Sequence, residues 1–265
     1  MKYSLTKQKQ VTNNYFQLLV LTLNTVLLVL LFVSPSQQYC SKFGRHLLQH
    51  QCVLTPEGTE GPYYLPRNLI RRDIREDRQG LPFRLKLTIT DVNSCEPLRN
   101  VSVDIWQCDA SGKYSGYIGH RPTSVQHAQP TDNTTFLRGV QITDDNGRAE
   151  FNTIFPGWYG GRTTHIHIQT HMGGKTVYTG QLYFTDKLVN RIARMQPYNM
   201  TTGHRNTNEG DYIFRRDSGN DTIIKRIKMI KQTNRLLASG LVGEMIIGLN
   251  PNTESPYALY GKGKR

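Results

Sequence analysis

The sequence predicts an all-β protein, an antiparallel β-sandwich with little helix. Two observations carry this prediction. Short runs that alternate apolar and polar residues recur along the chain, and turn sequences such as DDNG, PGWYGG and MGGK bound them. Residues 221–238 place apolar residues at helical spacing, with lysine and arginine on other positions, so one helix is expected there.

Six of the alternating runs are predicted to be strands, because a side-chain period of two gives a strand one buried and one exposed face. In chain order these strands are 83–92, 101–108, 149–155, 165–172, 176–184 and 243–250. No internal repeat or low-complexity linker divides them, and the length suits one domain. We therefore expect a single sandwich domain over residues 60–250, followed by a basic tail at 251–265.

The first 36 residues have the layout of a secretory signal peptide. Lys2, Lys7 and Lys9 precede an apolar run, and a small-residue pattern that ends at Ser36 follows it. We predict cleavage near Ser36, which leaves a secreted protein that is free of the membrane and has an N-terminal arm at 37–59. A retained membrane anchor is the alternative, because the apolar run is long enough to span a bilayer.

Four cysteines lie beyond the predicted cleavage point. An even number in a secreted chain indicates two disulfides. The sequence leaves three connectivities open, and proximity favours Cys40 with Cys52 and Cys95 with Cys108. Four glycosylation sequons agree with secretion, and they begin at Asn100, Asn133, Asn199 and Asn220.

The chain is strongly basic. Its formal charge of +13 falls to +10 once the three signal-peptide lysines are removed. This balance suits acidic substrates or anionic surroundings. The basic residues are scattered, and the sequence has no zinc-finger, ribonucleoprotein or basic-helix motif, so we expect no nucleic-acid partner.

The predicted strand 165–172 carries a pair of histidines one residue apart. His165 and His167 point to the same face, together with Gln169 and His171. Two imidazoles at this spacing can bind one metal ion, such as zinc, copper or iron. The alternative is an ordinary strand with a polar edge. Four histidines are predicted to be surface or core polar residues, namely His120, His127, His171 and His204.

Two tyrosines accompany this histidine pair. Tyr114 in GKYSGY follows the strand 101–108, and Tyr159 in PGWYGG comes just before the histidines. A phenolate is a hard anionic donor, so two phenolates with two neutral imidazoles would hold Fe(III) and resist its reduction. The alternative for both tyrosines is half-buried packing near turns. Tyr117 competes with Tyr114 for the first position.

With these residues together, the sequence resembles the intradiol ring-cleavage dioxygenases, the family of catechol 1,2-dioxygenase and protocatechuate 3,4-dioxygenase. The resemblance runs from about Glu60 to Phe184 and includes EGPYYLPRNL, VSVDIWQCDASGKYSGY, PGWYGGRTTHIHIQ and GQLYF. The family's order of Tyr, Tyr and His-x-His is intact. By this resemblance the Fe(III) ligands are Tyr114, Tyr159, His165 and His167.

The resemblance also implies roles for neighbouring residues. Arg162 matches the family's active-site arginine and would stabilise carbanionic character on the substrate ring. Gln181 matches a glutamine behind the ligands, and Tyr64 could line the substrate pocket. Tyr159 would leave the metal and help to remove a substrate proton, while Tyr114 stays bound.

The implied reaction cleaves a catechol between its two hydroxylated carbons and places both atoms of O2 in a muconate-type diacid. The chain lacks room for the helical dimerisation domain of cytoplasmic catechol dioxygenases, so we expect a monomer from the secreted branch of the family. Two other functions compete: a non-catalytic β-sandwich binding module and a zinc hydrolase. A binding module would be favoured if one of the four ligand residues were missing, but all four are present. A zinc hydrolase needs a glutamate placed as in HExxH, and the sequence has no such motif.

Overall fold

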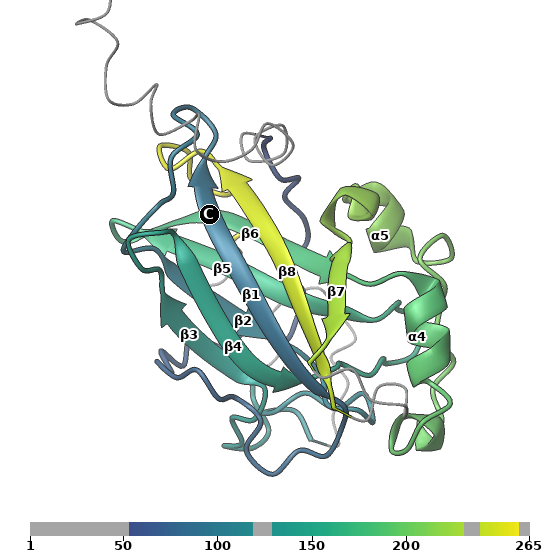
Figure 1. The fold of residues 1–265 in the computed structure, drawn as a ribbon. Coiled ribbons are helices and arrows are strands. Elements are labelled where there is room, and N and C mark those ends of the chain that lie inside the picture. The colour runs from purple at the N-terminus through teal and green to yellow at the C-terminus, as the bar shows by residue number, and fades with distance from the viewer. Residues whose placement is uncertain (1–52, 119–128, 231–238, 260–265) are drawn as a thin grey trace, which may run out of the picture. The chain divides into compact units, whose positions relative to one another are not determined.

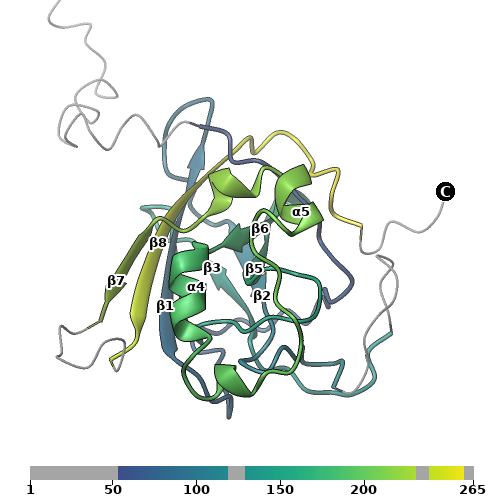
Figure 2. The same ribbon diagram turned by 90° about the vertical axis from the view of Figure 1, so that its right-hand side faces the viewer.

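The computed structural model describes residues 53–118, 129–230 and 239–259, so the predicted signal peptide lies outside it. Two four-stranded sheets stack as the layers of a β-sandwich (Figure 1), and Figure 2 shows these layers from the side. One sheet has the order β4-β1-β8-β7, which is Arg148–Ile154, Pro82–Asp91, Leu241–Leu249 and Arg226–Met229. The other has the order β3-β2-β5-β6, which is Arg138–Ile142, Ser102–Trp106, His165–Met172 and Lys175–Tyr183.

Alternating side chains fill the space between the two sheets. β1 contributes Phe83, Leu85 and Leu87, while Ile105 of β2 and Ile168 of β5 come from the other sheet, and each of the five is at most 1% exposed. Burial of a side chain of this size stabilises the fold by about 1.5–3 kcal/mol. Because β5 gives one face to this core, its opposite face is available for the histidines.

The predicted fold class is confirmed, with a difference in strand direction. All six predicted strands are present, and β3 and β7 are additional. β1 and β8 pair in parallel over Phe83–Leu241 to Asp91–Leu249, so the sandwich is not antiparallel throughout. A parallel pair needs a long connection between its strands. These two strands satisfy that condition because they lie near opposite ends of the domain.

The helix predicted at 221–238 is wrong over its described part. Gly219–Thr222 forms a 3-10 turn, η2, and Arg226–Met229 forms the edge strand β7, which pairs with β8. Ile224 between them is 1% exposed, and its amide donates to the carbonyl of Tyr183. Sheet pairing and burial thus outweigh a weak helical preference. Residues 231–238 lie outside the described part of the chain.

Short helices do occur, but elsewhere in the chain. They are α4 (Asp186–Ile192), the 3-10 turn η1 (Tyr198–Met200) and α5 (Tyr212–Arg216), and α4 and α5 lie at one side of the sandwich (Figure 1). Thr185 caps α4, and Asp211 caps α5 by accepting from the first-turn amides. Within the described ranges, no helix has the length and apolar character needed to cross a membrane.

The end of the predicted N-terminal arm is tied to the sandwich. The amide of Thr55 donates to Gly248 of β8, and the amide of Gly58 donates to Thr179 of β6. These backbone bonds lead the chain from β8 across to Thr59, beside the site described below. The predicted domain boundaries themselves stay a prediction.

The predicted pairing of Cys95 with Cys108 is wrong. Cys108 is a free thiol that is 2% exposed, whereas Cys95 is disulfide-bonded. Cys108 packs in an aromatic cluster that includes Tyr63 and Tyr114. Cys95 and Cys108 are close in sequence, but they are not bonded to each other. Cys40 and Cys52 lie outside the described residues.

We expect a thiol reagent to spare Cys108 in the native protein and to modify it after unfolding without reductant. Burial, together with the neighbouring Asp109, raises the pKa of this thiol and keeps the reagent out. Peptide mass spectrometry reads both states, and Cys95 is the internal control because it needs reduction first. A peptide that joins Cys95 to Cys108 would overturn this assignment.

Candidate metal site

Two histidines of β5 form the centre of the site. His165 and His167 project from the face opposite to the core residues Ile166 and Ile168, and they are 3% and 0% exposed. Trp106 of β2 lies opposite His167, and its ring stacks on the imidazole with the ring centroids 4.9 Å apart. The predicted pairing of the two histidines on one face is confirmed, and this face is buried rather than a polar edge.

Two further side-chain donors lie close to Nε2 of His167. The Nε2 atoms of His165 and His167 are 3.1 Å apart, and Nε2 of His167 lies 3.2 Å from the hydroxyl of Tyr114. His165 donates from Nδ1 to the carbonyl of Thr163 at 2.7 Å, which fixes its tautomer and leaves the Nε2 lone pair free. Ligands that share a metal at about 2.1 Å are separated by about 3.0–3.4 Å. The donor set therefore fits a metal ion.

Tyr114 reaches the histidines from the loop after β2. Asp109 shapes this loop, because its Oδ1 accepts from the amide of Ser111 at 2.9 Å and from the amide of Lys113 at 3.0 Å. An aspartate that bonds the backbone two and four residues later builds a tight turn. The turn delivers Tyr114, which is 2% exposed, to the imidazole pair.

Tyr63 borders both candidate tyrosine ligands. Its ring stacks on Tyr114 at 4.1 Å between centroids and meets Tyr159 edge-on at 5.6 Å. Tyr117, the competitor of Tyr114, packs edge-on against Tyr63 at 5.3 Å. Of the two tyrosines, Tyr114 is the one whose hydroxyl lies 3.2 Å from Nε2 of His167.

Tyr64, the predicted pocket residue, turns to a different neighbour. Its ring packs on Trp106 with centroids 4.8 Å apart, and its hydroxyl hydrogen-bonds to Asp104. Trp106 in turn stacks on His167, so Tyr64 supports the site from behind. Sequence reasoning missed Tyr63, since adjacent residues in an irregular segment carry no period that shows which one faces the site.

Tyr159 approaches from the loop before β5. Its ring lies 5.7 Å from that of Tyr114 and 5.8 Å from that of His165, measured between centroids. Arg162 donates from Nη1 to the Tyr159 hydroxyl at 3.1 Å. The structure thus brings the four predicted ligand residues together and adds a cation at one of the phenol oxygens.

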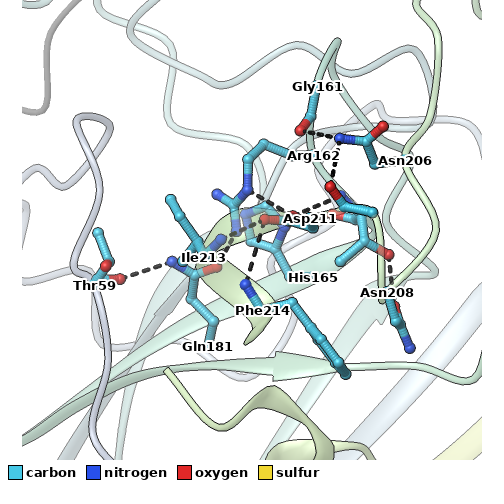
Figure 3. A network of polar contacts seen from close by, with 12 residues as sticks. Thr59, Gly161, Arg162, His165, Gln181, Asn206, Asn208, Asp211, Ile213 and Phe214 are labelled. Carbon is cyan, nitrogen blue, oxygen red and sulfur yellow. Dashed lines mark hydrogen bonds and ion pairs between the residues drawn. The ribbon is translucent and has the colours of Figure 1, made fainter. Parts of the chain in front are cut away.

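Arg162 donates from all three guanidinium nitrogens, and Figure 3 shows it beside Asp211 and Gln181. Besides the Tyr159 bond, Nε donates to Asp211 at 2.8 Å, and Nη2 donates to Oε1 of Gln181 at 2.6 Å. Gln181 donates from Nε2 to the carbonyl of Thr59 at 2.8 Å. Arg162 and Gln181 therefore lie with Tyr159, as predicted. Sequence reasoning missed Asp211 and Thr59, which are distant in the chain.

Burial controls ionisation at the site in the metal-free protein. It lowers the pKa of His165 to about 3, with Arg162 adding to the effect, and it lowers the pKa of His167 far below the ordinary value. Burial also raises the pKa of Tyr114 and of Tyr159, and Arg162 opposes both rises. The imidazoles are thus ready as neutral ligands, whereas the phenols must release protons when a metal binds.

The iron-free protein is expected to lose stability as the pH falls from about 6.5 to about 3. In this window His165 is neutral when folded and protonated when unfolded, so the unfolded chain binds more protons and stability rises with pH. Urea unfolding of the iron-free protein at about pH 7 and about pH 4 measures the slope. His165→Gln should flatten it, and an equal slope in that variant would contradict the assignment to His165.

Tyrosine oxygens are needed to complete this site. Among the described side chains, no group of three or more histidine, cysteine, aspartate and glutamate residues is placed to hold a metal ion. Zinc sites are built from such residues. Two imidazoles with two phenol oxygens suit ferric iron instead, because a phenolate is a hard anionic donor.

Comparison with known proteins identifies the class. A family model described as Dioxygenase matches residues 59–209, more than half of the chain. The chain belongs to the intradiol ring-cleavage dioxygenases, a family that uses non-haem iron and acts on catechols with O2.

Two curated relatives match part of the chain. A catechol 1,2-dioxygenase of Acinetobacter baylyi is 35% identical over 111 residues, which are 40% of this chain and 32% of that protein. The protocatechuate 3,4-dioxygenase beta chain of Burkholderia cepacia is 33% identical over 99 residues, 34% of this chain and 39% of that one. The matched part thus spans well under half the length of either relative.

A solved structure matches over a larger share. The intradiol ring-cleavage dioxygenase from Tetranychus urticae is 36% identical, with a TM-score of 0.72, and the match covers 78% of this chain and 98% of that chain. A hydroxyquinol 1,2-dioxygenase from Pseudomonas putida, at 15% identity and a TM-score of 0.53, shares the fold.

Proposed function

We propose that this chain is a non-haem Fe(III) dioxygenase that cleaves catechol-type rings between the two hydroxylated carbons. The observation that carries the proposal is the buried convergence of the His165 and His167 Nε2 atoms with the Tyr114 hydroxyl, at 3.1 and 3.2 Å. The names of the relatives, catechol and protocatechuate dioxygenases, support a substrate with two adjacent ring hydroxyls.

Tyr114, Tyr159, His165 and His167 would hold the metal. Bound there, ferric iron supplies a Lewis acid for the two oxygens of the catechol. The histidines enter as neutral ligands because burial disfavours their charged form. The tyrosines enter as phenolates, whose negative charges offset that of the ion.

Arg162 and Tyr159 form the proton-handling and charge-stabilising part of the site. Tyr159, as a phenolate, would accept a proton from the catechol at its phenolate oxygen and become a neutral phenol, and Arg162 Nη1 donates to that oxygen. Burial acts to lower the pKa of Arg162, but Tyr159, Tyr183 and Asp211 outweigh it and keep the guanidinium charged. A fixed cation is then in place to stabilise negative charge that develops on the ring.

The surrounding rings exclude water from these charges. Tyr63, Trp106 and Tyr114 are each at most 5% exposed. Trp106 and Tyr114 contact the His167 ring, and Tyr63 stacks on Tyr114. Electrostatic interactions are stronger in such a medium than in water. The aromatic wall therefore adds to the effect of Arg162.

Oxygen uptake with catechol tests the proposal. The purified protein, reconstituted with iron and given catechol under labelled oxygen gas, should form a muconate-type diacid that carries both atoms of one O2 molecule. The protein without added iron is the matched control. A protein that binds iron and catechol but consumes no oxygen would be the non-catalytic binding module instead.

Secretion is the second part of the proposal. Its support is the signal-peptide layout of residues 1–36 and the exposure of all four sequon asparagines, Asn100, Asn133, Asn199 and Asn220. A eukaryotic host should release the full-length chain into the medium in a form that an amidase specific for N-glycans shortens. Retention of the chain in the cell membrane would favour the uncleaved anchor.

A further inference from the structure

We propose that Asp211 is a positioning residue that fixes the Arg162 guanidinium against Tyr159 by tying it to the first turn of α5. This inference rests on the proposed function and extends it to a residue two positions beyond the segment that the family model matches. Its basis is a single buried carboxylate that accepts hydrogen bonds both from the loop before β5 and from α5 (Figure 3).

The two oxygens of Asp211 have separate partners. Oδ2 accepts from Nε of Arg162 and from the amide of Thr163, both at 2.8 Å. Oδ1 accepts from the amides of Ile213 and Phe214 at 2.8 and 3.3 Å, which caps α5. Asp211 is 0% exposed, so water cannot replace these donors without a change of structure. The loop before β5 is thereby anchored to a helix that follows it by 49 residues.

The bond to Nε sets the direction of the whole guanidinium. This group is planar, with its donors in a rigid fork, so a partner at Nε fixes where both Nη atoms point. Nη1 then faces the Tyr159 hydroxyl and Nη2 faces Gln181. Within the described part of the chain, Asp211 is the one carboxylate that accepts a hydrogen bond from Arg162. Its charge therefore also balances the buried cation.

A second path leads from Asp211 to a candidate metal ligand. Thr163 donates its amide to Asp211, and its carbonyl accepts from Nδ1 of His165. The backbone that orients the imidazole is thus held by the same carboxylate. Asp211 thus positions the cation through Arg162 and supports the ligand through Thr163.

Two substitutions separate positioning from folding. Asp211→Asn keeps Oδ1 as a helix cap, since asparagine caps as well as aspartate, but its Nδ2 donors oppose Nε of Arg162 and the Thr163 amide. Asp211→Glu keeps the charge and displaces it by one methylene. We expect kcat to fall by about 10- to 100-fold in both variants. KM should change by less than about threefold, because the lost interaction acts in the transition state.

A measurement without iron or substrate accompanies the kinetics. In ¹⁵N NMR of the iron-free wild type, the Nε–H signal of Arg162, identified by its loss in Arg162→Lys, should exchange slowly with solvent. Asp211→Glu and Asp211→Asn should each speed this exchange. Thr185→Ala removes the corresponding cap of α4 away from Arg162, and it should lower stability without changing either readout.

The outcomes separate this inference from the proposed function. A wild type without ring cleavage after iron loading overturns the proposed function and the inference with it. An active wild type whose Asp211→Glu and Asp211→Asn variants keep kcat within about twofold overturns the inference alone. If Thr185→Ala, which only lowers stability, reduced kcat as much as the Asp211 variants do, the loss in those variants would come from stability, and Asp211 would be a structural cap alone.

Discussion

Replacing His165 with alanine is expected to abolish iron binding and ring cleavage. The substitution removes one of the two Nε2 donors that lie 3.1 Å apart, so the site keeps a single imidazole. Loss of a supporting residue behind a metal ligand costs roughly 10- to 100-fold in affinity or activity, and loss of the ligand itself should cost more. Iron analysis of the purified variant and its rate of catechol turnover measure the effect.

His171→Ala is the matched control on the same strand. Its imidazole bonds Thr176 through Nδ1 at 3.0 Å, past the irregular register between Thr170 and His171, and it is not part of the donor cluster. Iron content and turnover should stay at the wild-type level in this variant. If His165→Ala also kept both, the assignment of the histidine pair would fail.

Arg162→Ala is expected to lower turnover by about 100- to 1000-fold, the typical cost of removing a preorganised donor that stabilises developing charge. The variant also leaves the buried Asp211 carboxylate without its cation. Breaking a buried ion pair costs about 3–5 kcal/mol, and the lower end applies here because Asp211 keeps three backbone donors. Steady-state kinetics and urea unfolding read the two effects separately.

Arg205→Ala provides the comparison for this prediction. The Arg205 side chain is 11% exposed, against 12% for Arg162, so the two guanidinium groups are similarly buried. The partner of Arg205, Asp186, is 31% exposed, whereas Asp211 is 1% exposed. Loss of the Arg205 pair should reduce stability and leave turnover within about twofold. Equal loss of turnover in both variants would show that Arg162 acts through folding alone.

The fold was predictable because alternation along each strand reflects which side chains meet the core. The pattern could not reveal strand neighbours that are far apart in sequence, so the parallel pairing of β1 with β8 was missed. The helix predicted at 221–238 failed for a related reason. Spacing of apolar residues describes one segment alone, whereas β7 is determined by its partner β8.

The candidate site divides in the same way. His165 and His167 follow from a strand period of two, and Tyr114 and Tyr159 follow from their family motifs. Asp211 carries no such signal, because a single aspartate before a short helix reads only as a cap. Its contact with Arg162 exists only once the chain has folded. The wrong pairing of Cys95 with Cys108 likewise came from sequence distance, which does not measure distance in space.

The visible absorption spectrum tests the central claim most directly. Tyrosinate bound to ferric iron absorbs visible light by charge transfer, so the iron-loaded protein should be coloured, and catechol added without oxygen should shift the band. This result is predicted if Tyr114 and Tyr159 bind iron beside His165 and His167. A protein that stays colourless after reconstitution with Fe(III) would contradict the proposed iron site and favour the binding module.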